Sequence, residues 1–269
     1  MKYGLPKLAK TGEDVGFKTV AGAVYTKDGL SVQDHLDKLN NKNTESSSSI
    51  INLKIGILGD GILAGVGLED PENTSFNGLL AKHFASCINY GVSGRMIAYM
   101  EDDYGHPTPY VTGYATMSDN LDLIVIHGTT NDWYYCTPIG NITDTDVTTY
   151  YGALNTLILG LQSKYPGKDI FFVTPLPRTD EINVDGEVVT RTSSDPNEIG
   201  KTLLDYNDVM ITACKRHSMP VIDLYSNSGM NIAHNNQHKE YYTQNGNHLT
   251  EAGHHKEYKY LFNQIVSRL

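Results

Sequence analysis

The feature that most constrains the fold is an alternation of short, apolar, β-rich runs with segments long enough to form helices. The β-rich runs lie at residues 53–58, 121–126, 170–173 and 221–224, with a shorter one near Ile88. Helical patterns lie at residues 76–84, 147–164, 199–217 and 251–269. Strands joined by helix-length crossovers form parallel sheets with helices on both faces. The sequence therefore predicts a doubly wound α/β domain.

The first part of the chain lacks this alternation. Val32, Leu36 and Leu39 fall on one apolar stripe of a predicted helix of about three turns. Because so short a helix is marginal alone, the stripe must dock on another surface. That surface belongs either to the chain's own α/β domain or to a partner, and we expect self-association into a homo-oligomer or attachment to another protein. The predicted parts are an arm at residues 1–45, a Ser-rich linker at 46–51 and the α/β domain at 52–269.

The charge balance excludes several classes of partner. The chain has 31 acidic and 21 basic residues and a formal net charge of -10, so we expect it to bind neither nucleic acid nor an anionic membrane. No apolar run approaches the roughly 20 residues of a membrane span. The start, Met1-Lys2-Tyr3-Gly4, lacks the apolar core of a secretory signal. We expect the protein to stay where it is made or to leave by another route, such as lysis of the host cell.

The sequence carries no pattern for a metal or another cofactor, and we expect none. Cys87, Cys136 and Cys214 are isolated from one another, at spacings that match no zinc or redox motif. His234 and His238 lie in an Asn- and Gln-rich stretch that we predict to be a loop, with no further ligand at suitable spacing. Reduced thiols and solvated histidines are therefore the expected state.

Tyrosine is the one unusual feature of the composition, with 18 tyrosines against 6 phenylalanines. Three pairs stand out, at Tyr134-Tyr135, Tyr150-Tyr151 and Tyr241-Tyr242. Such pairs can form flat amphipathic faces on which sugars and polar polymers stack, and they can equally be half-buried surface residues.

In a doubly wound sheet the working site lies at the carboxyl ends of the strands. The motifs there are Gly-Asp-Gly at 59–61, Gly-Val-Ser-Gly at 91–94 and Thr-Thr-Asn-Asp at 129–132, followed near the end of the chain by Asn-Gly-Asn-His at 245–248. In this order they resemble the four blocks of the SGNH (GDSL-type) hydrolase family. The resemblance implies a three-layer α/β/α sandwich with a flavodoxin-like, parallel five-stranded sheet. It also implies an esterase or acetylesterase site.

The resemblance assigns roles to individual residues. Members of the family use a Ser-His-Asp triad, in which histidine accepts the serine proton and three donors stabilise the oxyanion. Those donors carry over as Gly94, Asn131 and the backbone N–H of Gly61, and the base carries over as His248. We expect these four residues to meet in one cleft.

Two catalytic positions depart from the family. Gly61 stands where the family has its nucleophilic serine, and Asn245 stands where it has the triad aspartate. An asparagine can orient the ring of His248 but favours the wrong tautomer, which costs about 10⁴-fold in a serine protease. Thr129 replaces a glycine of the third block, a smaller change. The proton-transfer groups are thus lost while the oxyanion donors remain.

Three functions stay open at this point. The first is a binding module, without a nucleophile, that holds an acylated cell-surface glycan or a similar polymer. The second is an active serine esterase or deacetylase in which Gly61, Asn245 or both are introduced substitutions, or which uses an activated water. The third is a structural scaffold.

The arm bears on the biological context. Residues 20–33 resemble the attachment segments of bacteriophage tail-fibre and receptor-binding proteins, which often carry SGNH-type domains. This resemblance implies a place in the virion, with other virion proteins as partners. A bacterial esterase, cytoplasmic or at the cell surface, is the alternative.

Overall fold

A computed structural model of the protein describes residues 52–101, 105–184 and 186–269. The predicted arm, with its helix and its attachment segment, and the whole of the predicted linker lie outside these residues. The described residues belong to one compact unit, Ile50–Leu269. No helix within them is both long and apolar enough to cross a membrane.

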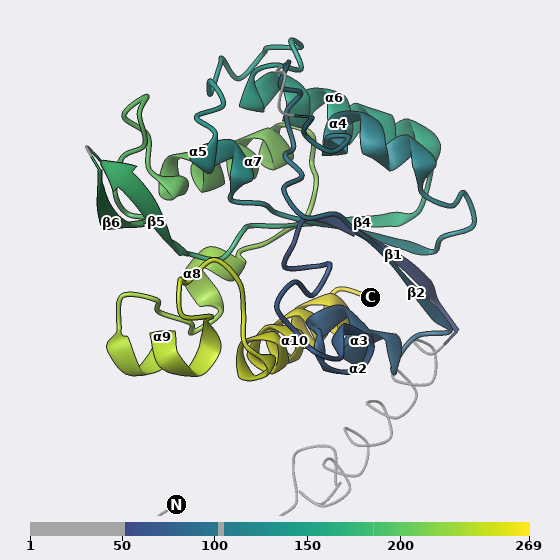
Figure 1. Ribbon diagram of the computed structural model, residues 1–269. Coiled ribbons are helices and arrows are strands. Elements are labelled where there is room, and N and C mark those ends of the chain that lie inside the picture. The colour runs from purple at the N-terminus through teal and green to yellow at the C-terminus, as the bar shows by residue number, and fades with distance from the viewer. Residues whose placement is uncertain (1–51, 102–104, 185) are drawn as a thin grey trace, which may run out of the picture. The chain divides into compact units, whose positions relative to one another are not determined.

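A parallel sheet of five strands forms the centre of the domain (Figure 1). Its strands are β1 (Lys54–Gly59), β2 (Ser86–Gly91), β3 (Leu123–His127), β4 (Asp169–Val173) and β7 (Val221–Ile222). Their order across the sheet is β2-β1-β3-β4-β7, and every neighbouring pair is parallel. The predicted three-layer, flavodoxin-like α/β fold is confirmed.

Helices cover both faces of the sheet, with α3 and α10 on one face and α4, α6 and α7 on the other (Figure 1). The helices are α2 (Pro71–Thr74), α3 (Phe76–Ala81), α4 (Tyr110–Gly113), the 3₁₀ helix η2 (Tyr114–Thr116), α5 (Asn131–Tyr134), α6 (Tyr150–Lys164), α7 (Leu203–Arg216), α8 (Leu224–Asn227), α9 (Asn235–Tyr241) and α10 (Glu251–Val266). Helix α7 begins four residues later than predicted, because Thr202 and Asp205 form a capping box there.

The alternation of side chains along the strands divides the core into two halves. In β3, Ile124 and Ile126 pack with the α6 and α7 side, whereas Leu123 and Val125 pack with the α3 and α10 side. Successive side chains of a strand point to opposite faces, so a strand covered on both faces must be apolar throughout. This is why the core strands appear in the sequence as continuous apolar runs.

A β-hairpin and a helix differ from the sequence prediction. Strands β5 (Thr179–Val184) and β6 (Glu187–Thr192) form an antiparallel hairpin that was not predicted. The first four residues of β6 are exposed, so that strand has no apolar run to reveal it. The predicted loop around His234 and His238 is wrong, because helix α9 occupies Asn235–Tyr241. This helix buries none of its residues and therefore lacks an apolar period.

Candidate active site

The turn after β1 brings the backbone of Gly61 to the carboxyl edge of the sheet. Asp60 is only 5% exposed, and its Oδ1 accepts a hydrogen bond of 3.0 Å from the backbone N–H of Ile62. The carbonyl of Gly61 accepts a second hydrogen bond from the backbone N–H of Val66. The turn is therefore held from both sides of Gly61.

The imidazole of His248 lies directly against Gly61. A Cβ atom built on Gly61 would lie 2.9 Å from Nε2 of His248 and 3.3 Å from Oγ of Ser93. Since Cβ atoms essentially never approach closer than 3.0 Å, a side chain at this position would push the imidazole back slightly. His248 is thus within reach of a hydroxyl at position 61, and glycine supplies none.

The loop before α10 holds the backbone of His248. The backbone N–H of His248 donates to Oγ1 of Thr243, and the carbonyl of His248 accepts from the backbone N–H of Thr243 at 2.9 Å. Burial lowers the pKa of His248, and the nearby positive charge of Arg178 acts in the same direction, against the opposite effect of Asp60. The imidazole is therefore neutral at pH 7, as a general base must be.

Asn245, at the position of the triad aspartate, makes its side-chain hydrogen bonds to other groups than this imidazole. Its Oδ1 accepts hydrogen bonds from Oγ1 of Thr243 and from the backbone N–H of Asn247, so the exposed side chain stabilises its own turn. Within the described part of the chain, no hydrogen bond holds the ring of His248. The side-chain hydrogen bonds of Asn245 thus go to its own turn, and an orienting role toward His248 stays a prediction.

Besides Gly61, the predicted oxyanion donors are Gly94 and Asn131, on the loops after β2 and β3. Gly94 has a φ of 78°, in the left-handed region that glycine adopts without strain. Nδ2 of Asn131 donates one hydrogen bond of 2.9 Å to the carbonyl of Arg95, which fixes the amide and leaves its second N–H for a ligand. The hydroxyl of Thr129 accepts from the backbone N–H of Asn131, so this departure from the family pattern is structurally useful.

Asp132 ties these two loops together. Its carboxylate is 1% exposed and accepts hydrogen bonds from the backbone N–H groups of Ile97 at 2.8 Å and Ala98 at 3.1 Å. Burial raises the pKa of Asp132 to about 6 despite these hydrogen bonds. The buried carboxyl group of Asp132, together with the hydrogen bond from Asn131 to Arg95, therefore holds the Gly94 loop against Asn131.

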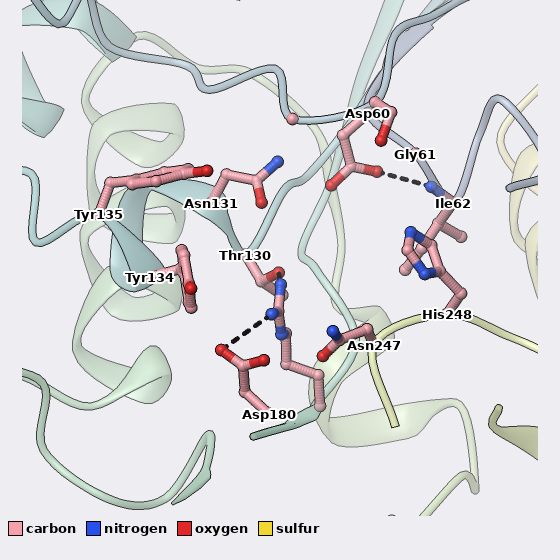
Figure 2. A pocket seen from close by; sticks show the side chains of 13 residues that line it. Asp60, Gly61, Ile62, Thr130, Asn131, Tyr134, Tyr135, Asp180, Asn247 and His248 are labelled. Atoms are coloured by element: carbon pink, nitrogen blue, oxygen red, sulfur yellow. Dashed lines mark hydrogen bonds and ion pairs between the residues drawn. The ribbon is translucent and has the colours of Figure 1, made fainter. Parts of the chain in front are cut away.

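The four predicted residues line one cavity of about 230 Å³ (Figure 2). Its lining residues are Asp60, Gly61, Ile62, Ser93, Gly94, Thr130, Asn131, Tyr134, Tyr135, Arg178, Asp180, Asn247 and His248. Figure 2 shows the side chains of Asp60, Asn131 and His248 converging on the same space. Asn245 is not among the lining residues. The geometry thus brings the predicted base and oxyanion donors together, while their chemical roles remain predictions.

The sequence analysis missed one wall of the cavity. Arg178 and Asp180 come from the segment after β4, and an ion pair of 3.3 Å joins them. Nη1 of Arg178 donates to Oγ1 of Thr130 at 2.9 Å, and its guanidinium lies over the ring of Tyr134 at 5.2 Å. The end of β4 is a fourth strand end at the same edge of the sheet. The rule that located the other motifs could have identified this segment as well.

The three tyrosine pairs have different environments. Tyr134 and Tyr135 line the cavity, with their rings edge to face and centroids 4.8 Å apart. Tyr150 and Tyr242 are buried in the core instead, at 0% and 3% exposure. The first pair alone among the three is placed to stack on a ligand in this cavity.

The cysteines take no part in the site. Burial raises the pKa of both Cys87 and Cys214 to about 12, so their thiols stay protonated and unreactive. Cys136 follows the tyrosine pair with a φ of 58°. Within the described residues, no group of three or more His, Cys, Asp or Glu side chains is arranged to hold a metal ion.

Comparison with known proteins connects this geometry to a family. The sequence model of the GDSL-like lipase/acylhydrolase family matches residues 57–256. This range contains Gly61, Gly94, Asn131 and His248. A search of curated proteins finds no match.

Solved structures resemble the domain over 81% of the chain and nearly all of their own length. A protein from Lactobacillus plantarum is 26% identical, with a TM-score of 0.67, and 99% of that chain is covered. An aryl esterase from M. smegmatis is 21% identical, with a TM-score of 0.55. Est24, a carbohydrate acetylesterase from Sinorhizobium meliloti, is 13% identical, with a TM-score of 0.57. The last two are covered completely, and their likeness concerns the fold.

Proposed function

Because the chain belongs to the GDSL-like lipase/acylhydrolase family, we propose that it is a catalytically impaired member that binds an acylated cell-surface glycan or a similar polymer. The observation that carries the proposal is the contact between His248 and Gly61. The base lies 2.9 Å from the point where the Cβ of a nucleophile would begin, and the residue there has no side chain. Without a serine hydroxyl, this position cannot form an acyl-enzyme.

The oxyanion side of the site supports binding without turnover. The backbone N–H groups of Gly61 and Gly94 and the free amide N–H of Asn131 are the donors that an acyl oxygen requires. Tyr134 and Tyr135 add aromatic surface to the same cavity. An ester or acetyl group can therefore be held while the groups for proton transfer are missing.

Covalent labelling tests the proposed impairment. Incubation with a serine-directed fluorophosphonate, followed by intact-mass measurement, should leave the mass unchanged, and p-nitrophenyl acetate should give no burst. An active serine esterase serves as the positive control for the reagent. An adduct that disappears in the variant His248→Ala would contradict the proposal, because it would show that another nucleophile works with this base.

The second candidate is an active serine esterase or deacetylase in which Gly61 and Asn245 are introduced substitutions. The position of His248 favours it, because a serine at 61 would need only a small retreat of the imidazole. The double variant Gly61→Ser with Asn245→Asp separates the candidates. Esterase turnover in this variant supports the second candidate. Its absence, in a variant that unfolds at the same temperature as the parent chain, supports the first.

We also propose that residues 1–45 attach the domain to a bacteriophage tail, so that the ligand is a polymer of the host surface. This rests on the resemblance of residues 20–33 to phage attachment segments and on the apolar stripe of Val32, Leu36 and Leu39. A homo-oligomer is the expected assembly, since the apolar stripe of so short a helix must dock on another surface.

A further inference from the structure

The wall of the cavity that follows β4 combines a charged pair with an aromatic ring. Arg178 and Asp180 are joined at 3.3 Å, and the guanidinium of Arg178 lies 5.2 Å from the ring centre of Tyr134. Behind them, Nη2 of Arg191 lies 3.9 Å from Asp180, and the Arg191 guanidinium lies over Trp133 at 4.5 Å. Arg178 donates a hydrogen bond to Thr130, and Thr130 directly precedes the oxyanion donor Asn131 in the chain.

Several polar atoms of this wall have unused hydrogen-bonding capacity. The side chain of Asp180 is 7% exposed, and its Oδ2 makes ion pairs but no hydrogen bond within the described residues. Nε of Arg178 and Oδ1 of Asn247 are likewise buried without a hydrogen-bond partner there. All three side chains line the cavity. An N–H donor and two oxygen acceptors side by side match hydroxyl groups, which both donate and accept.

The charges of the cavity disfavour an anionic ligand. Among the described lining residues, Asp60 and Asp180 are negative and Arg178 is positive. Arg191, behind the wall, brings this local sum to zero, and the whole chain carries a formal charge of -10. A carboxylate or phosphate would meet two carboxylates in a cavity with no excess of positive charge. Like charges placed together at a binding site weaken binding strongly.

We propose that Arg178 and Asp180 form a subsite for neighbouring hydroxyl groups of an uncharged sugar ring, so that the cavity selects neutral over acidic acylated glycans. The inference rests on the proposed function and adds the class of ligand to it. With the acyl oxygen at Asn131, the sugar that carries the acyl group reaches the wall next to Thr130. Its hydroxyls then donate to Asp180 and accept from Arg178, while Tyr134 packs against its apolar face.

The test uses two probes that share the acetyl group, an O-acetylated xylo-oligosaccharide and an O-acetylated oligogalacturonate, measured by calorimetry with the full chain. We expect the neutral probe to bind at least about tenfold more tightly. The variant Asp180→Asn should weaken binding of the neutral probe about tenfold, because it removes an acceptor for the sugar hydroxyls. It should strengthen binding of the acidic probe, because it removes a negative charge from the wall. Asp119→Asn is the matched control, because this side chain is 87% exposed and lies outside the cavity. It should change the affinity for neither probe.

The outcomes separate the two proposals. The subsite is overturned if the unaltered chain binds the acidic probe as tightly as the neutral probe, or more tightly. It is also overturned if Asp180→Asn loses the same factor of affinity for both probes. The comparison on the unaltered chain decides the question if Asp180→Asn fails to fold. Failure of both probes to bind the unaltered chain overturns the proposed function and the subsite together.

Discussion

A buried ion pair between β3 and α10 makes the stability of the domain depend on pH. Nε2 of His127, at the end of β3, lies 2.7 Å from Oε1 of Glu257 on α10, and both side chains are 0% exposed. Burial acts to lower the pKa of His127, but the charge and hydrogen bond of Glu257 outweigh it and raise that pKa. Burial also raises the pKa of Glu257. The folded pair therefore keeps one proton up to a higher pH than the unfolded chain does.

The sign and size of the effect follow from proton counting. Above the unfolded histidine pKa of about 6.5, the unfolded chain has released this proton and the folded chain still holds it. The free energy of unfolding then falls by about 1.4 kcal/mol for each pH unit, until the pH reaches the raised pKa of His127 in the folded chain. For a domain of about 200 residues this corresponds to about 3 °C of melting temperature per unit. Burial lowers the pKa of His254 to about 3, so that histidine is neutral in both states at this pH.

Thermal unfolding between pH 7 and 8.5, at constant ionic strength, measures this slope. The unaltered chain should lose about 3 °C per unit. The variant Glu257→Gln should lose most of the slope, because a neutral amide cannot keep His127 protonated. Glu251→Gln, at an exposed position on the same helix, should retain it. A melting temperature that is constant or rises with pH in the unaltered chain would refute the reasoning, as would an unchanged slope in Glu257→Gln.

Three further predictions concern the site and the arm. Asn131→Ala should weaken binding of an acetylated oligosaccharide about tenfold in calorimetry, because it removes an oxyanion donor; unchanged affinity would place the acyl group elsewhere. Asp132→Ala should lower the free energy of unfolding, measured with urea, by about 3 kcal/mol, since two buried N–H groups lose their acceptor. Asp146→Ala, at an exposed side chain, should have little effect. Light scattering should give a smaller assembly for a chain that starts at Ile51 than for the full chain. Equal monomeric masses for the two chains, with no partner found for residues 1–45, would count against a role of these residues in assembly.

The sheet, and the location of the site at the carboxyl ends of its strands, were predictable because they follow from the burial of the strands. Strands β1, β3 and β4 are covered on both faces, so their sequences are apolar apart from a charged or polar residue at one end, and they stand out from the rest. The motifs at Gly61, Gly94 and Asn131 each follow a parallel strand, and parallel strands end at one edge. This reasoning needs only the order of the elements along the chain.

The orientation of side chains and the β5–β6 hairpin were not predictable in the same way. A motif gives the position of Asn245 in the chain, but the turn that its side chain stabilises decides which way it points. The end of β4 marks the segment that contains Arg178 and Asp180, but no apolar pattern shows that these two charged residues are buried, because the neighbouring strand β6 is largely exposed. Their burial becomes evident only when the hairpin is folded against Tyr134.

The acetyl methyl signal of an O-acetylated xylo-oligosaccharide, followed by proton NMR in the presence of the full chain, tests the central claim most directly. Broadening of this signal reports binding, and the growth of free acetate reports hydrolysis in the same sample. We expect saturable broadening, reduced in Asn131→Ala, without release of acetate beyond that of the buffer. Acetate release at about one per second or faster, lost in His248→Ala, would contradict it and show that another group has replaced the missing serine.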